Sequence, residues 1–172
     1  MYLLQKKLFV FVFLVGVGLK LGAQQTTIWV VRHAEKDTAA AAKMDPPLSA
    51  LGEQRVKDLT AYLAHVHFDN IFSTDTKRTR ATAAAVSAPL LIYSARSFSD
   101  LATTIMPEFK GKKILIVGHS NTVLETIEAL GGKRPIAALT DDDYDYIFKL
   151  TIDAAGKLTV DMAHFGAVHR KQ

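Results

Sequence analysis

The sequence contains no cysteine. This absence excludes disulfide bonds, catalysis by a thiol nucleophile and metal sites built on thiolates. The folded chain must therefore be stabilised by its hydrophobic core, and an apolar content of 49% is ordinary for a globular domain. A length of 172 residues is too short for two typical domains.

The chain also lacks an uncharged apolar run long enough to cross a bilayer. The N-terminal run covers residues 8–19, whereas a transmembrane helix needs roughly 20 residues. Two lysines precede this run, and Leu21-Gly22-Ala23 supplies small residues suited to cleavage. The pattern predicts a signal peptide over residues 1–23 and an exported protein, periplasmic or secreted. A lysine close to the cleavage point leaves an uncleaved membrane anchor as the alternative.

There is no strong excess of one charge. Removing residues 1–23 takes three lysines and no acid from a net charge of +4, which leaves +1. A charge near zero gives no electrostatic reason to expect nucleic acid or an anionic membrane as a partner. We therefore expect a small-molecule partner, and the sequence indicates no oligomeric state.

The remaining chain alternates strand-like and helix-like segments. Apolar runs rich in β-branched residues predict strands at 28–31, 70–73, 90–93 and 114–117. Helical patterns follow at 50–64, 77–87, 100–109 and 122–130, the first of them capped by Ser49. Alternation at 146–152 and 157–163 predicts a final hairpin. We expect one α/β domain over residues 24–172, with three α/β/α layers around a mostly parallel sheet.

Polar clusters follow three of the predicted strands. They are Arg32-His33, the segment 73–78 with Arg78, and Gly118-His119-Ser120-Asn121. Reactive groups of an open α/β sheet gather beyond the carboxyl ends of its strands, and neighbouring strands lie about 4.8 Å apart. The sequence therefore predicts two arginines and two histidines around one small anion.

These residue types suit phosphoryl transfer. Arginine forks stay charged and bind phosphate oxygens in pairs, and a neutral imidazole is a good nucleophile. We expect His33 to attack phosphorus and to form a phosphohistidine that water hydrolyses. Arg32, Arg78 and His119 would bind the transferring group, and the Asn121 amide would add a donor.

Four segments resemble motifs of the histidine phosphatase superfamily, the phosphoglycerate mutase-like group. Segment 30–36 resembles its Arg-His signature, 74–83 its second-arginine motif, 117–122 its second-histidine motif, and 47–52 its Leu-Thr-x-x-Gly stretch. The resemblance implies a phosphoglycerate mutase-like fold, phosphohistidine chemistry, and no metal or cofactor. One departure is Ala34, which stands where the family commonly has glycine.

No motif places the carboxylate that would protonate the leaving group. Asp100 lies in the region where mutase-like members carry an acid, and Glu35 lies beside the predicted nucleophile. Either residue, or neither, could be the donor. The acidic run 141–143 with Asp145 lacks the glycine and the terminal glutamate of a calcium loop, so we expect a solvated turn there.

The expected activity is hydrolysis of small phosphate monoesters without a metal. Mutases of the resembled group carry insertions that close over their substrate, and this chain has little room for such a lid. A mutase-like phosphoryl transferase is one alternative. A non-catalytic module that binds a phosphorylated ligand in the same pocket is the other.

Overall fold

The computed structural model describes residues 25–39 and 44–168, so the predicted signal peptide lies outside the described residues. The elements run in chain order as β1 Thr26–Arg32, α1 Ala50–Tyr62, β2 Asn70–Ser73, α2 Lys77–Ala83, β3 Leu90–Ile92, α3 Phe98–Glu108, β4 Lys113–Gly118, α4 Val123–Ala129, β5 Tyr146–Ile152 and β6 Leu158–His164. No helix within the described ranges is both long and apolar enough to cross a membrane.

The strands form one six-stranded sheet in the order β3-β2-β4-β1-β5-β6. The first four strands in that order are parallel, while β5 pairs antiparallel with β1 and β6 antiparallel with β5. The prediction of a mostly parallel sheet closed by a hairpin is therefore confirmed, as is the three-layer α/β fold.

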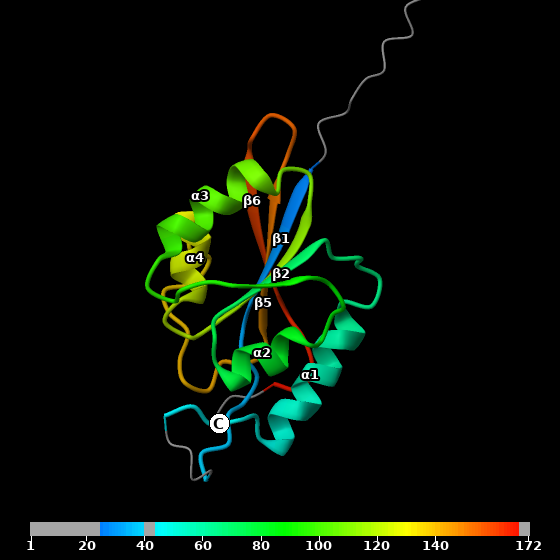
Figure 1. Cartoon of the computed structure of the whole chain (residues 1–172), viewed down its shortest axis with the longest axis vertical. Coiled ribbons are helices and arrows are strands. Elements are labelled where there is room, and N and C mark those ends of the chain that lie inside the picture. Colours follow the sequence, from blue (N-terminus) through cyan, green and yellow to red (C-terminus); the bar gives the residue numbers. More distant parts are fainter. Residues whose placement is uncertain (1–24, 40–43, 169–172) are drawn as a thin grey trace, which may run out of the picture.

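The sheet is covered on both faces, which explains the continuous apolar runs in its central strands. Ile28, Val30 and Ile116 contribute to the core beneath α3 and α4. Trp29 and Val117 alternate with them and contribute to the core beneath α1 and α2. Figure 1 shows α3 and α4 on one side of the sheet and α1 and α2 on the other.

All four helices depart from the predicted boundaries, by one to four residues. Helix α2 ends at Ala83 rather than near residue 87, because the next amides bond three residues back and tighten the chain into a turn. Helix α3 begins at Phe98, two residues before the predicted start at Asp100.

Helix α1 is anchored to the chain that follows β1. Ser49 caps the helix by accepting a hydrogen bond from the Gly52 amide at 3.1 Å, as predicted, and its own amide donates to the Glu35 carbonyl at 2.9 Å. A β-carbon on Gly52 would overlap the same carbonyl. Glycine at this position therefore lets α1 pack against the backbone two residues beyond His33.

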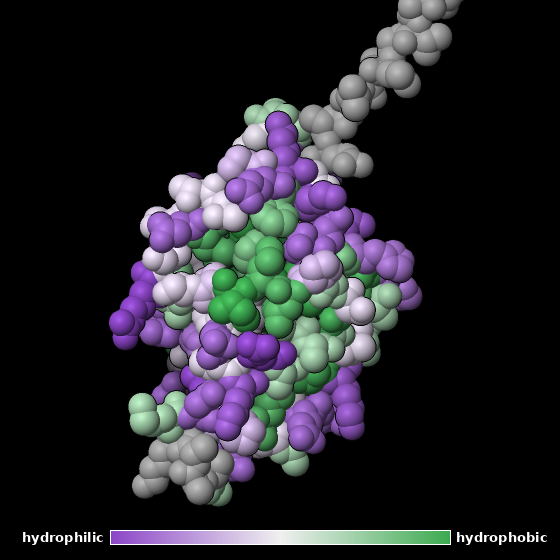
Figure 2. Space-filling model, in the orientation of Figure 1, coloured by the Kyte–Doolittle hydropathy of each residue, from purple (hydrophilic) through white to green (hydrophobic). Residues whose placement is uncertain are grey.

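The outer edge strand β3 is short and partly exposed. It has three residues, and its side chains Leu90, Leu91 and Ile92 are between 38% and 48% exposed. A short edge strand offers few unpaired backbone groups to other chains. In the view of Figure 2, an apolar area lies among hydrophilic residues near the middle of the face.

Candidate active site

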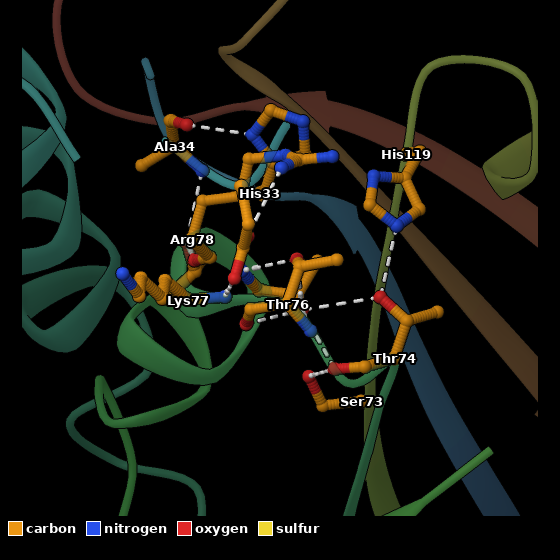
Figure 3. Close-up of polar contacts among 11 residues, drawn as sticks. His33, Ala34, Ser73, Thr74, Thr76, Lys77, Arg78 and His119 are labelled. Atoms are coloured by element: carbon orange, nitrogen blue, oxygen red, sulfur yellow. Dashed lines mark hydrogen bonds and ion pairs between the residues drawn. The ribbon is translucent and has the colours of Figure 1, made fainter. Parts of the chain in front are cut away.

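The predicted nucleophile and the three residues predicted to bind the phosphoryl group line one open pocket at the carboxyl ends of β1, β2 and β4. They are His33, Arg32, Arg78 and His119. The β1–β4 register pairs Arg32 with Gly118, so His33 and His119 follow side by side. Their imidazole centroids lie 5.3 Å apart (Figure 3). Arg78 reaches the same pocket from the first turn of α2.

His33 is held as a neutral ring with one nitrogen available. Its Nδ1 atom lies 2.7 Å from the Ala34 carbonyl oxygen, which can only accept, so we assign the ring proton to Nδ1. The pKa of His33 is lowered to about 3, chiefly by burial. The hydrogen bond to Ala34 opposes this shift, and the nearby charges of Arg32 and Arg78 add to it. The Nε2 lone pair is therefore unprotonated at neutral pH.

His119 is oriented by the loop that follows β2. Its Nε2 atom lies 2.9 Å from Thr74 Oγ, whose hydroxyl donates to Thr79 Oγ at 3.1 Å, so we assign Nε2 as the donor to Thr74. The other ring nitrogen, Nδ1, points to the side of His33 in Figure 3. Burial, together with the nearby charges of Arg78 and Arg32, lowers the pKa of His119 to about 4.

The Arg32 guanidinium is fixed by a loop more than 100 residues away in sequence. Its Nη1 atom donates to the carbonyl oxygens of Thr140, Asp141 and Asp143 at 2.8, 3.0 and 3.2 Å. Tyr144 packs against its face, with the guanidinium carbon 3.9 Å from the ring centroid. Its Nε atom is buried and has no hydrogen-bond partner within the described residues.

Arg78 is positioned in a similar way by the loop that precedes α1. Its Nη1 atom lies 3.4 Å from Asp45 Oδ1, and the same carboxylate accepts from the Lys77 amide at 3.1 Å. Arg78 Nε is also buried and lacks a partner within the described residues. Buried donors are normally satisfied, so two unpartnered guanidinium nitrogens at one pocket indicate a site for an anion.

The structure brings neither candidate proton donor to this pocket. Glu35 is buried, and its Oε1 atom accepts from Arg55 Nε and Nη2, both at 2.7 Å. It borders an adjacent hollow instead, since the side chains alternate along the chain after His33. Asp100 is exposed in the first turn of α3 and borders a third hollow beside Leu91, because the chain turns away after β3.

Sequence reasoning missed the carboxylate that does border the pocket. Among the described residues that line it, Asp141 is the one acid, and its Oδ1 atom lies 3.9 Å from Arg32 Nη2. The expected solvated turn is wrong for part of this run, since Asp143 and Asp145 are buried. Asp143 accepts a hydrogen bond from the Thr140 amide at 2.6 Å, and Asp145 contacts His164 Nδ1 at 2.9 Å.

The outer part of the pocket contains further polar side chains. Asn121, a predicted binding residue, borders the pocket together with Ser120, both on the turn after β4. Lys36 and Arg96 also border it, from the loops that follow β1 and β3, and the sequence patterns indicated neither. No strand or helix motif distinguishes such loop residues from ordinary surface charges.

The family model of the histidine phosphatase superfamily, branch 1, matches residues 28–101, which include Arg32, His33 and Arg78. No curated protein sequence gives a significant match.

Several solved structures share the fold at low sequence identity. A protein of Nakamurella multipartita named as a phosphohistidine phosphatase SixA is 19% identical, with a TM-score of 0.63 over 85% of this chain and 99% of that chain. A protein histidine phosphatase SixA complexed with tungstate is 17% identical, with a TM-score of 0.61 over 80% and 96%. Phosphoserine phosphatase from Entamoeba histolytica is 15% identical, with a TM-score of 0.60 over 84% and 98%. The chain is therefore similar to the histidine phosphatase superfamily over residues 28–101, and it shares its fold with these solved phosphatases.

Proposed function

We propose that this protein is a phosphatase that hydrolyses small phosphate monoesters through a phosphohistidine on His33, without a metal ion. The observation that carries the proposal is the composition of one pocket. A neutral imidazole with a free Nε2 atom lies there beside two guanidinium groups, whose buried Nε atoms lack partners within the described residues.

In the first step, the Nε2 lone pair of His33 attacks phosphorus, the bond to the leaving oxygen breaks, and that oxygen takes up a proton. The ring gains positive charge as the P–N bond forms, and the Ala34 carbonyl on Nδ1 stabilises that charge. Arg32 and Arg78 contact the equatorial oxygens, where negative charge is spread in the transition state.

In the second step, water attacks the phosphohistidine, the P–N bond breaks, and phosphate leaves with His33 neutral again. His119 serves both steps through Nδ1, because Nε2 is engaged with Thr74. A bound phosphoryl dianion favours the protonated ring, which then donates from Nδ1 to a phosphoryl oxygen. Asp141, the acid that borders the pocket, supplies the proton to the leaving oxygen in the first step and takes a proton from the attacking water in the second.

The solved relatives support a small phosphorylated substrate. One of them is complexed with tungstate, and the Entamoeba histolytica phosphoserine phosphatase is complexed with 3-phosphoglyceric acid. We also retain export, to the periplasm or the exterior, as part of the proposal, on the strength of the N-terminal residues 1–23.

Turnover of 4-nitrophenyl phosphate by the purified protein tests the proposal. We expect activity that survives a chelator, is inhibited by vanadate, and is lost in His33→Ala. The matched control is His65→Ala, which changes an exposed histidine outside the pocket. A second experiment mixes the enzyme rapidly with labelled substrate and stops the reaction with alkali, because phosphohistidine is destroyed by acid. We expect the label on His33.

Four results would overturn parts of the proposal. Activity retained by His33→Ala would remove the nucleophile, and dependence on added metal would remove the mechanism. Phosphate binding without turnover would favour the non-catalytic alternative, and transfer of the label to an acceptor alcohol in preference to water would favour the transferase.

A further inference from the structure

The pocket carries more positive charge than one phosphoryl group requires. Arg32, which is buried, and Arg78, which is half-buried, supply two guanidinium groups at its base, and Lys36 and Arg96 add two exposed cations at its outer part. A phosphate dianion is matched by the two arginines alone. The two outer cations therefore lie where the remainder of the substrate enters.

These two cations have different surroundings. Lys36 also borders the adjacent hollow, whose other lining residues include the acids Asp37, Asp141 and Asp142. Three carboxylates that share a hollow with a lysine reduce the positive potential that it presents to a ligand.

Arg96 shares the pocket with one acid, Asp141, and does not border the adjacent hollow with its several acids. Within residues 25–39 and 44–168, its guanidinium takes part in no ion pair and no hydrogen bond, and the one bond of this residue is from its amide to Ser94 Oγ at 3.3 Å. It borders the pocket beside Ser120 and Asn121, which offer a hydroxyl and an amide. These three side chains form a set of donors outside the phosphoryl-binding base.

We propose that Arg96, assisted by Ser120 and Asn121, binds a second anionic group on the leaving group, such as a carboxylate or a second phosphate. The substrate class is then phosphate monoesters of small acids, or bisphosphates, rather than esters of neutral alcohols. A planar guanidinium suits both anions, because it can bind two oxygens at once. This inference rests on the proposed phosphatase function and specifies its substrate.

Two matched pairs of substrates isolate the second charge. The 3- and 4-carboxyphenyl phosphates are compared with the 3- and 4-carbamoylphenyl phosphates, which differ by a carboxylate against a neutral amide. We expect kcat/KM to favour at least one carboxylate ester over its amide by about tenfold, the range of a hydrogen bond to a charged group. Phenyl 1,3-bisphosphate provides the same comparison for a second phosphate.

The variant Arg96→Gln should abolish that preference by lowering kcat/KM for the carboxylate ester, while leaving the amide esters within about twofold. Inhibition by inorganic phosphate should stay unchanged, because the base of the pocket is intact. Lys36→Gln should reduce the preference far less. Arg80→Gln is the matched arginine control, since Arg80 pairs with Asp75 at 2.8 Å and does not border the pocket.

The outcomes separate the two levels of the argument. Equal kcat/KM values for carboxylate and amide esters, or a preference that survives Arg96→Gln, would overturn the second anion site while the phosphatase stands. Failure to hydrolyse any of these esters, including 4-nitrophenyl phosphate, would overturn the proposed function itself.

Discussion

The Arg32 guanidinium lies over the ring of Tyr144, with its central carbon 3.9 Å from the ring centroid. Tyr144 is buried and also lies 6.0 Å, centroid to centroid, from the His33 ring. A cation over an aromatic face is attracted by the ring quadrupole, and a buried ring cannot move aside. The tyrosine therefore positions the arginine that we propose to bind phosphate.

Replacing this ring should weaken phosphate binding. We expect Tyr144→Leu to lower kcat/KM by about tenfold, which lies between the values for an exposed and a desolvated cation–π contact, and Tyr144→Phe to keep most of the activity because the ring face remains. Phosphate inhibition constants measured beside kcat/KM report the position of Arg32. Equal losses in Tyr144→Phe and Tyr144→Leu would show that the ring face is not what matters.

The buried pair of Glu35 and Arg55 should contribute to stability rather than to catalysis. Removing one partner leaves a buried charge alone, so Arg55→Met should lower the free energy of unfolding by about 3–5 kcal/mol. The double variant Glu35→Met/Arg55→Met should recover most of that loss. Urea unfolding measures both values.

The same pair tests whether Glu35 donates a proton. Under conditions where Glu35→Gln remains folded, we expect its kcat to stay close to the wild-type value for both alkyl and nitrophenyl phosphates. A loss confined to the alkyl esters would restore Glu35 as the proton donor.

Stability should fall as the pH is lowered through the range set by the buried histidines. The folded pKa of His33 is about 3, well below its ordinary value of 6.5, so the unfolded chain binds more protons between these values. The free energy of unfolding should therefore fall with decreasing pH below about 6.5, by roughly 1 kcal/mol per pH unit from this residue, and should be unaffected by it above that pH.

Comparison with His33→Gln isolates the contribution of this residue. The difference in stability between the two proteins should vary with pH between about 6.5 and 3 and stay constant above this window. A constant difference across the whole range would mean that His33 titrates as an ordinary exposed imidazole.

Asp141 should matter most for poor leaving groups. It is the one carboxylate among the described residues that line the pocket, and we therefore propose it as the proton donor there. We expect Asp141→Asn to slow alkyl phosphates by about 100-fold while changing 4-nitrophenyl phosphate little. The backbone carbonyl that holds Arg32 is unaffected by the substitution.

Asp142→Asn is the neighbouring control, since Asp142 does not border the pocket. Equal slowing of both ester types by Asp141→Asn would argue against proton donation and in favour of a general electrostatic effect.

Much of the fold and of the pocket follows from local sequence patterns. Strands β2 and β5 have the predicted limits, because their apolar patterns match the faces that the sheet buries. Arg32, His33 and His119 were predicted to converge because each directly follows a strand, and strand ends of a parallel sheet share one edge.

The sequence by itself determined the strand ends and the residues that they carry, since periodicity and turn residues act over a few positions. Only the tertiary structure decided what surrounds those residues. The loop around Asp141 reaches Arg32 across 109 positions, and Arg55 pairs with Glu35 across 20. Such contacts depend on how α1 packs against the sheet and on where the loop before β5 lies. Short-range sequence patterns determine neither of these.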